Sequence, residues 1–306
     1  MNQVMNLEDY LHIEAVDRMQ QYIHSHLHEP ITLSQLSHEA LYSPWHSARL
    51  FKDYLGKTPF EYIRLLRLTE SAKLLREGKP KVVDLAFDFL FSSHEGFTKA
   101  FTKAFGLPPS RYLKETPAIK QFYPTNLLIY HKTILKGVTD MEKIQDTRAI
   151  FVQVVERPRR KLMLKRGIKA TEYFEYCEEV GCDVWGILTS VKEALYEPIG
   201  LWLPEKLIKK GTSEYVQGVE LALDYDKPIP DGFEIIELEP CKMMVFQGEP
   251  YNDDDFMDEV MKAKVAIEKY DPKIVGYRYD FENHPRFQLS PEGYRGYIEA
   301  YPVTNL

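Results

Sequence analysis

Two stretches of the sequence match each other at an offset of 50 residues: SARLFKDYLGKTPFEYI at 47–63 and FTKAFTKAFGLPPSRYL at 97–113. The coinciding pairs are Phe51 with Phe101, Gly56 with Gly106, Pro59 with Pro109 and Tyr62 with Tyr112. Similarity at a fixed spacing is typical of a duplicated structural unit. The repeat therefore predicts two copies of one motif, and we place both within residues 8–115.

Each copy has the pattern of a short helix, a tight turn and a second helix. In the first copy Leu36 and Ala40 recur at helical spacing. Ser43 and Pro44 then suit the N-cap and first position of a new helix, and Gly56 suits its end. The expected helices, with a connecting helix between the copies, cover residues 45–55, 60–76, 82–90 and 94–105. The predicted N-terminal domain is all-α, with two helix-turn-helix motifs.

Charge and spacing are compatible with DNA binding. The chain has a formal net charge of −7, but residues 44–115 carry 13 Lys and Arg against 8 Asp and Glu. This basic excess is small, so charge alone does not identify DNA as a partner. The connecting helix would span roughly 25 Å, which suits two recognition helices held about one DNA turn, ~34 Å, apart.

The repeated tail, Phe-x4-Gly-x2-Pro-x2-Tyr, resembles the signature of the AraC/XylS family of transcription regulators. The Trp45-His46 pair is similar to that of the family's MarA, SoxS and Rob type. The resemblance covers residues 8–115. It implies DNA-base contacts from Trp45, Ala48 and Arg49 in the first reading helix and from His94, Glu95, Thr98 and Lys99 in the second. Ala48 and Glu95 depart from the polar amides expected there, so we expect a different target sequence.

The chemistry of these side chains suits DNA. Arg49 can bind the O6 and N7 atoms of guanine, and Glu95 can accept a hydrogen bond from the N4 of cytosine. Thr98 suits contact with a thymine methyl group, and for Lys99 and Lys103 a phosphate contact is as open as a base contact.

Other positions have two interpretations or a structural one. Base contact and packing are equally open for Trp45. Lys52 is either a contact to the DNA backbone or part of a solvated face. Phe51, Phe97 and Phe101 are expected in the core of the domain.

The second half of the chain has a different pattern. Residues 116–148 lack clear periodicity and are interpreted as a linker, with a short element expected at 126–136. Beyond them we expect strands at 151–156, 161–165, 216–223, 243–247 and 297–303, and helices at 171–180 and 256–270. A second repeat aligns 161–167 with 242–248 and 215–220 with 294–299, at offsets of 81 and 79. Residues 149–306 are therefore predicted to form an α+β domain of two pseudo-symmetric strand-helix-strand-strand halves with a cleft between them.

Strand alternation assigns side chains to the faces of that domain. Ile298 is expected to face the helices, and Tyr297, Glu299 and Tyr301 to face away from them, toward the cleft. Glu220, which has small residues on either side of it on its own face, is expected to line the same cleft. An acid among aromatic rings suits an organic cation, through Coulomb and cation–π attraction.

This half resembles the GyrI-like effector-binding domain, through residues 297–303 and 229–233 and the glycines Gly186 and Gly276. The resemblance implies that Glu299 is the ligand-facing carboxylate. Further candidates for the wall of the site are Trp185, Trp202, Tyr279 and Tyr294. The structural alternative for Glu299 is an exposed or ion-paired strand residue, and for each Trp or Tyr it is core packing.

Together these patterns predict a sequence-specific DNA-binding transcription regulator controlled by a small-molecule effector, cationic or aromatic, in the C-terminal cleft. Double-stranded DNA and the effector are the expected partners, and RNA polymerase is a further candidate. Three cysteines and no long apolar run favour a cytoplasmic protein with no membrane contact. We expect no enzyme activity, no cofactor and no metal. The alternatives are hydrolysis of a small molecule by the GyrI-like half, with Glu299 as general base, and a protein-interaction module.

Overall fold

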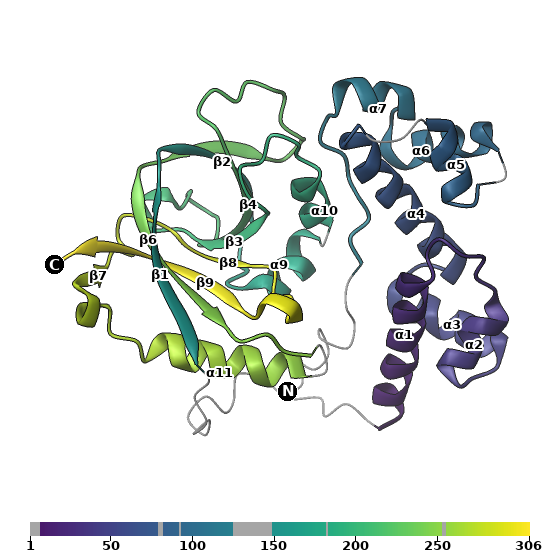
Figure 1. Ribbon diagram of the computed structural model, residues 1–306, viewed down its shortest axis with the longest axis horizontal. Helices are drawn as coiled ribbons and strands as arrows, with labels where there is room; N and C mark the ends of the chain where they lie inside the picture. The colour runs from purple at the N-terminus through teal and green to yellow at the C-terminus, as the bar shows by residue number, and fades with distance from the viewer. Residues whose placement is uncertain (1–6, 79–81, 92, 125–148, 182, 253–254) are drawn as a thin grey trace. The chain divides into compact units, whose positions relative to one another are not determined.

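The computed structural model describes residues 7–78, 82–91, 93–124, 149–181, 183–252 and 255–306. The chain divides into two compact units, residues 1–135 and 136–306 (Figure 1). The described residues of the first unit form two apolar cores, and those of the second form a separate one. The element expected at 126–136, and most of the predicted linker, lie outside the described residues. Among the helices described, none combines the length and the apolar character that crossing a membrane requires.

The described part of the first unit is helical. Its helices are α1 (Leu7–Ser25), α2 (Leu33–Ala40), α3 (Pro44–Leu55), α4 (Pro59–Arg76), α5 (Val82–Asp88), α6 (His94–Phe105) and α7 (Pro109–Glu115). The pairs α2–α3 and α5–α6 are the two predicted helix-turn-helix motifs, and α4 is the predicted connecting helix. The helical N-terminal fold is therefore confirmed.

Local signals start and end the second helix of each motif. Ser43 caps α3, and Ser93 caps α6, by accepting a hydrogen bond from the backbone N–H three residues on, at 3.4 and 3.0 Å. Gly56 and Gly106 end these helices in the left-handed region, with φ of 66° and 79°. Glycine adopts this conformation without steric cost. Both copies therefore use the same caps at the same offset of 50 residues.

The turn inside the motif is one residue longer in the second copy. Leu41 and Leu90 both follow the first helix in the left-handed region, with φ of 60° and 59°. Their N–H groups bond the carbonyl three residues back in the same way. From this shared point the chain reaches its N-cap in two residues at Ser43 and in three at Ser93. The offset between the copies is thus 49 before the turn and 50 after it.

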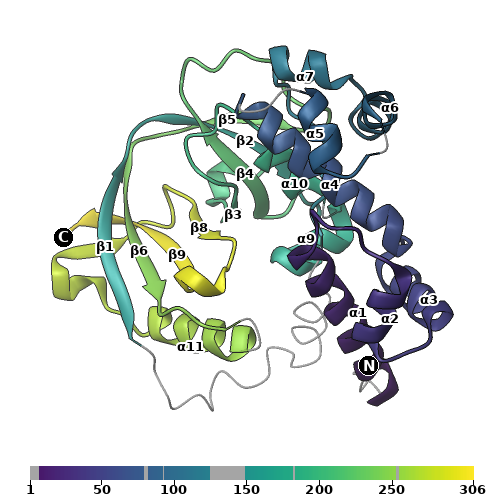
Figure 2. The same ribbon diagram turned by 45° about the vertical axis from the view of Figure 1, so that its right-hand side comes forward.

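Helix α4 belongs to the cores of both motifs. Its first half contributes Ile63 and Leu66 to the core formed with α1, α2 and α3. Its second half contributes Ala72 and Leu75 to the core formed with α5, α6 and α7. At 1.5 Å per residue, a helix of this length spans about 27 Å. Figures 1 and 2 show α3 beside one end of α4 and α6 beside the other.

Packing onto the first unit continues beyond α7. The Phe122 N–H donates to the Thr69 hydroxyl of α4 at 2.9 Å. Ile119 is buried in the second core, and Phe122 packs against the first. The stretch 117–124, which lies within the predicted linker, therefore packs on the helical unit.

The second unit combines an antiparallel sheet with helices, as expected for α+β. Its elements are β1 (Ile150–Arg157), β2 (Arg160–Arg166), α9 (Tyr173–Val180), α10 (Asp183–Thr189), β3 (Ile199–Trp202), η2 (Glu205–Leu207), β4 (Tyr215–Leu221), β5 (Glu234–Leu238), β6 (Cys241–Gly248), α11 (Phe256–Glu268), η4 (Pro272–Val275), β7 (Tyr277–Tyr279), β8 (Arg286–Leu289), η5 (Gly293–Arg295) and β9 (Ile298–Asn305). The five predicted strands and two predicted helices are present. Sequence patterns missed the short strands β3, β5, β7 and β8 and the helix α10.

The strand order of the described sheet is β1-β6-β9-β8-β3-β4-β2-β5, with β7 also paired to β9. Counted inward from the two edges of the sheet, β1 corresponds to β5, β6 to β2, β9 to β4 and β8 to β3. The sheet is strongly bent between these two ends (Figure 2). One face carries the core that includes Leu162, Met243 and Ala300.

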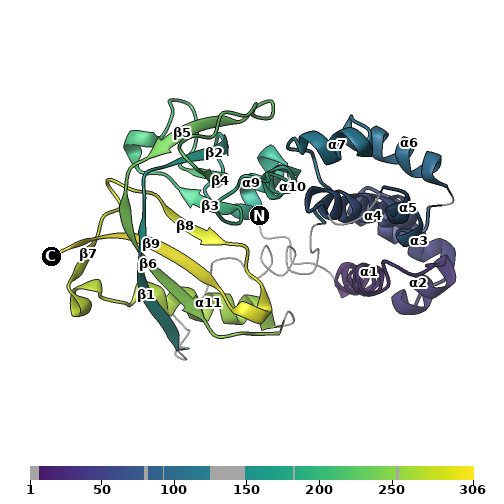
Figure 3. The ribbon, with the colours of Figure 1, turned by 45° about the horizontal axis from the view of Figure 1, so that its top comes forward.

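Helices cover the other face of the sheet. On α11, Lys264 lies 5.8 Å from the centre of the Tyr297 ring. On α9, the Tyr176 ring lies 5.6 Å from the ring of Tyr215 on β4. Figure 3 shows α11 alongside β1 and β6, and α9 beside β3 and β4. We call this side of the sheet the helix face.

Candidate nucleic-acid interface and ligand site

Helix α3 presents the predicted DNA-contacting side chains to solvent. Trp45 is 71% exposed, and the Arg49 side chain is 64% exposed. Lys52 is exposed and Ala48 is half-buried. Phe51, on the opposite side of the helix, is fully buried as predicted. The exposure of Trp45 removes core packing as its explanation.

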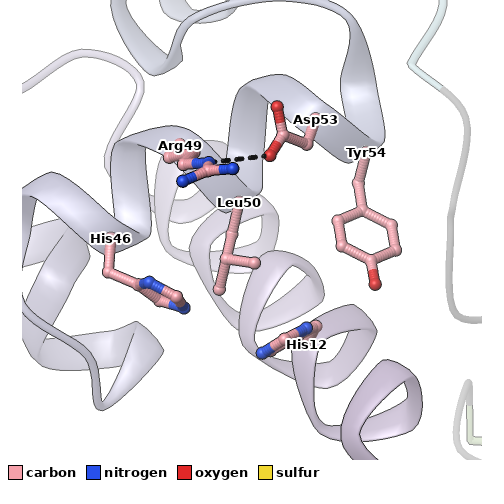
Figure 4. Close-up of a pocket in the computed structure, with 6 residues that line it drawn as sticks. All are labelled: His12, His46, Arg49, Leu50, Asp53 and Tyr54. Carbon is pink, nitrogen blue, oxygen red and sulfur yellow. Dashed lines mark ion pairs between the residues drawn. The ribbon is translucent and has the colours of Figure 1, made fainter. Parts of the chain in front are cut away.

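Arg49 is held by contacts within its own helix. Its Nε lies 3.4 Å from an oxygen of Asp53 (Figure 4). Its guanidinium lies 5.7 Å from the centre of the Trp45 ring. Exposed ion pairs of this kind contribute little stability, because water screens them. The guanidinium is therefore pre-positioned on the surface yet free to exchange Asp53 for a stronger partner.

Helix α6 repeats this arrangement. His94, Glu95, Lys99 and Lys103 are exposed, and Thr98 is half-buried. The aromatic residues that alternate with them, Phe97 and Phe101, are fully buried as predicted. All the predicted base-reading positions of both helices thus lie at the surface or its edge.

A hollow of about 460 Å³ lies beside α3. Its wall is formed by His12, His46, Arg49, Leu50, Asp53 and Tyr54, with His12 coming from α1 (Figure 4). The His12 and His46 rings are 5.8 Å apart, centre to centre. Sequence reasoning missed this feature, because α1 and α3 meet only in the folded domain.

In the second unit, Glu299 is a buried carboxylate on the helix face of β9. Its side chain is 5% exposed. The Tyr297 hydroxyl donates to it at 3.1 Å, and a guanidinium nitrogen of Arg286 lies 3.8 Å away. Burial raises the pKa of Glu299, while the positive charges of Lys264 and Arg286 act in the opposite direction.

Aromatic residues lie near this carboxylate. Tyr297, just before β9, and Tyr301, within it, share the face of Glu299, because each lies two residues away along the extended chain. Trp202 of β3 contacts Arg286, and the Arg286 guanidinium lies 4.4 Å from the centre of the Trp202 ring. The structure thus brings together an acid, two tyrosines and a tryptophan that the sequence had singled out.

The remaining predicted wall residues lie at different places. The Tyr279 ring packs 5.4 Å from that of Tyr301, at the edge of the group. Trp185 of α10 is 5% exposed and packs against Tyr173. Tyr294 is 74% exposed. Core packing therefore accounts for Trp185.

The expected face assignment around Glu299 is wrong. Glu299 pairs with Phe246 of β6, and Lys264 of α11 lies over the neighbouring Tyr297. These residues therefore face the helices, and Ile298 and Ala300 face the other way. Glu299 therefore lies on the same face of the sheet as the helices and not on the opposite face.

Glu220 does not join this group. It pairs with Leu162, so its side chain lies on the opposite face from Glu299, where the apolar core of the sheet is formed. There it accepts hydrogen bonds from Arg157 at 3.0 Å and from Arg160 at 2.5 Å. The sequence repeat aligned Glu220 with Glu299, but the observed strand register differs from that alignment by an odd number of residues. Because neighbouring side chains of a strand point to opposite faces, the expectation that Glu220 and Glu299 share a cleft is wrong.

The observed pairing identifies a different counterpart for Glu299. Gln217 pairs with Lys165 on β2, and Glu299 pairs with Phe246 on β6. Lys165 and Phe246 are related by the offset of 81 that the sequence repeat gave. Gln217 therefore occupies the position of Glu299 in the other half, and Tyr215 occupies that of Tyr297. Sequence reasoning missed both Gln217 and Arg286, because neither lies in a recognisable motif.

Comparison with known proteins identifies the first unit. Residues 36–115 match a family model described as a helix-turn-helix domain. The probable transcription factor PqrA of Proteus vulgaris is 39% identical over 84 residues, which are 28% of this chain and 69% of PqrA. The right origin-binding protein of Escherichia coli K12 is 38% identical over 91 residues, which are 30% of this chain and 32% of that protein.

The chain therefore belongs to the AraC family of helix-turn-helix transcription factors, as the repeated motif predicted. It matches about a third of the length of relatives such as the right origin-binding protein. The chain also aligns with SAV2435 bound to tetraphenylphosphonium, at 15% identity over 50% of this chain and 94% of that chain. The TM-score of that alignment is 0.33, which does not establish a shared fold.

Proposed function

We propose that this chain is a transcription regulator that places α3 and α6 in successive major grooves of DNA. The observation that carries the proposal is the matched exposure of Arg49 and Lys99 on two helices with the same caps, beside opposite ends of α4. Arg49 and Glu95 supply base contacts, and Lys52, Lys99 and Lys103 supply contacts to phosphate.

Selection of a bound duplex from a random library, followed by titration at several salt concentrations, tests this proposal. On the selected duplex, Arg49→Ala should weaken binding by about 1–3 kcal/mol and relax the sequence preference at one position. Lys99→Ala should weaken binding to all sequences and lower the salt dependence. The control is Arg64→Ala, which removes an exposed arginine from α4. Wild-type affinity in both test variants would overturn the proposal.

The second part of the proposal is that an organic cation bound at Glu299 controls the regulator. Its support is a buried carboxylate that lies near Tyr297 and Tyr301, with Trp202 beside the neighbouring Arg286. A desolvated anion beside aromatic faces attracts a cation strongly. This is also the role that the GyrI-like resemblance implies for Glu299.

The matched pair of 1-methylquinolinium and neutral quinoline tests this part by calorimetry on the full chain at about pH 7.5. The cation should bind and quinoline should not, and Glu299→Gln should raise the dissociation constant for the cation at least about tenfold. Glu156→Gln, an exposed change on β1, is the control. DNA binding should respond to the cation in the wild type but not in Glu299→Gln. Equal binding of both compounds would exclude a cation site.

A further inference from the structure

A side chain of the protein itself already contacts the proposed cation site. The guanidinium of Arg286, on β8, lies 4.4 Å from the centre of the Trp202 ring and 5.9 Å from that of Tyr301. One of its nitrogens lies 3.8 Å from a carboxylate oxygen of Glu299. Arg286 thus touches the acid and two of the aromatic faces that a bound cation would use.

Guanidinium is chemically a good substitute for such a ligand. It is planar, its charge is delocalised, and it stacks on aromatic faces. An aromatic monocation has the same three properties, with a larger apolar surface. Both would therefore compete for the same place between Trp202 and Glu299.

The ion pairs of Arg157 and Arg160 with Glu220 are buried, and they provide a comparison for the contact of Arg286 with Glu299. The side chains of Arg157 and Arg160 are only 14% and 3% exposed, and they reach Glu220 at 3.0 and 2.5 Å. Arg286 differs in both respects, since its side chain is 37% exposed and its contact with Glu299 is longer. A half-exposed arginine can move into water at much lower cost than a buried one.

We propose that Arg286 is an internal competitor that occupies the cation site until an effector displaces its guanidinium. This inference rests on the proposed function of Glu299 as a cation receptor. It also narrows the effector class. Planar aromatic monocations stack on Trp202 better than guanidinium does, whereas small ammonium ions gain too little to displace it. Arg286 is therefore the residue that sets both affinity and selectivity.

Calorimetric titration of the full chain with 1-methylquinolinium tests this inference. Arg286→Gln should bind the probe about tenfold more tightly than the wild type, because no guanidinium has to leave the Trp202 ring. Tetramethylammonium should also gain detectable binding in this variant. The control is Arg278→Gln, which removes the same charge from an exposed position on β7. Its affinity should equal that of the wild type.

A second variant separates charge from stacking and protects the test against misfolding. Arg286→Lys keeps the positive charge but loses the planar group, so its affinity should lie between those of the wild type and Arg286→Gln. Thermal melting verifies that each variant is folded. Quenching of tryptophan fluorescence by the probe, abolished in Trp202→Phe, would place the ligand on the ring that Arg286 now covers.

The outcomes distinguish the inference from the function on which it rests. Equal or weaker binding by Arg286→Gln, with wild-type binding still lost in Glu299→Gln, overturns the competitor role and leaves the cation site standing. Failure of the wild type and both Arg286 variants to bind any cation in a Glu299-dependent way overturns the site, and the inference with it.

Discussion

Both units of this protein contain a repeat, and the two repeats behave differently. In the helical unit, the copies in sequence and in structure agree: Ser43 and Ser93 cap equivalent helices, and Gly56 and Gly106 end them. In the sheet unit, the strand order also repeats, but the two glutamates that the sequence aligned lie on opposite faces.

The difference follows from how each structure is specified. A helix cap is a contact between residues three positions apart, so the sequence displays it directly. A strand's face depends on its register with a neighbour that is distant in sequence, and a slip by an odd number of residues reverses it. By strand pairing, the counterpart of Glu299 is Gln217. The two copies of the second repeat therefore share a pairing pattern but differ at this position, where one has an acid and the other an amide.

The largest expected effect concerns Glu220, which lies on the opposite face of the sheet from the proposed ligand site. Glu220→Gln should lower the free energy of unfolding by about 3–5 kcal/mol, because Arg157 and Arg160 would lose their buried counter-charge. Urea denaturation measures this loss. Glu237→Gln, which breaks an exposed pair with Arg159, should change stability by less than about 0.5 kcal/mol. If Glu220→Gln were as mild as its control, Glu220 would not be a structural residue.

Replacing Gln217 by glutamate, the residue found at the equivalent position 299, should also lower the stability of the protein. Gln217 is fully buried, so Gln217→Glu should destabilise the protein by about 3 kcal/mol at about pH 8, because it desolvates a carboxylate. Burial raises the pKa of such a group, so the loss should be smaller at about pH 5. Denaturation at both pH values measures this, with the exposed Gln153→Glu as control. A loss independent of pH would contradict the electrostatic explanation.

The reciprocal change at Glu299 should act in the opposite direction and more weakly. Because the folded-state pKa of Glu299 is raised by burial, its contribution to stability is fully present below the ordinary carboxyl pKa. It is lost as the pH rises through the raised value. Glu299→Gln should therefore gain stability relative to the wild type over that window. Arg286 and Lys264 limit the gain. Melting curves from about pH 4 to 8 measure the difference, and a constant difference would contradict the raised pKa.

The two N-caps should be equivalent if the helical repeat is as regular as its geometry. Ser43→Ala and Ser93→Ala should each cost about 1 kcal/mol, because each leaves a backbone N–H of its helix without a partner. Denaturation of the two variants provides the comparison, and Ser34→Ala within α2 serves as the control. A large difference between the two caps would show that the copies depend on their surroundings.

The smallest expected effect concerns the turns. Leu41→Gly should stabilise the protein by about 0.5 kcal/mol, because glycine removes the steric strain of a left-handed leucine. The entropy that glycine gains in the unfolded state offsets part of this stabilisation. Leu41 is 77% exposed, so the change removes little packing. Leu90→Gly should gain less, since Leu90 is 42% exposed. Thermal melting measures both, and destabilisation by Leu41→Gly would show that its side chain has a packing role.

Much of the candidate DNA interface could be predicted from the sequence. The repeat located α3 and α6, and helical periodicity separated buried residues such as Phe97 from exposed ones such as Lys99. The contacts of Arg49 with Asp53 and Trp45 also lie within one helix, four residues apart. The hollow beside His12 could not be predicted, because it forms between two helices whose packing the sequence does not display.

The candidate ligand site was predicted only in part. Sequence alone determined the helical repeat, its caps and the aromatic neighbours of Glu299 along β9, because all of these depend on residues close together in the chain. Tertiary structure decided that Glu299 faces the helices, that Glu220 belongs to a buried ion-pair cluster, and that Arg286 reaches across to Trp202. These outcomes depend on strand register, which long-range pairing across the whole sheet sets and no local pattern encodes.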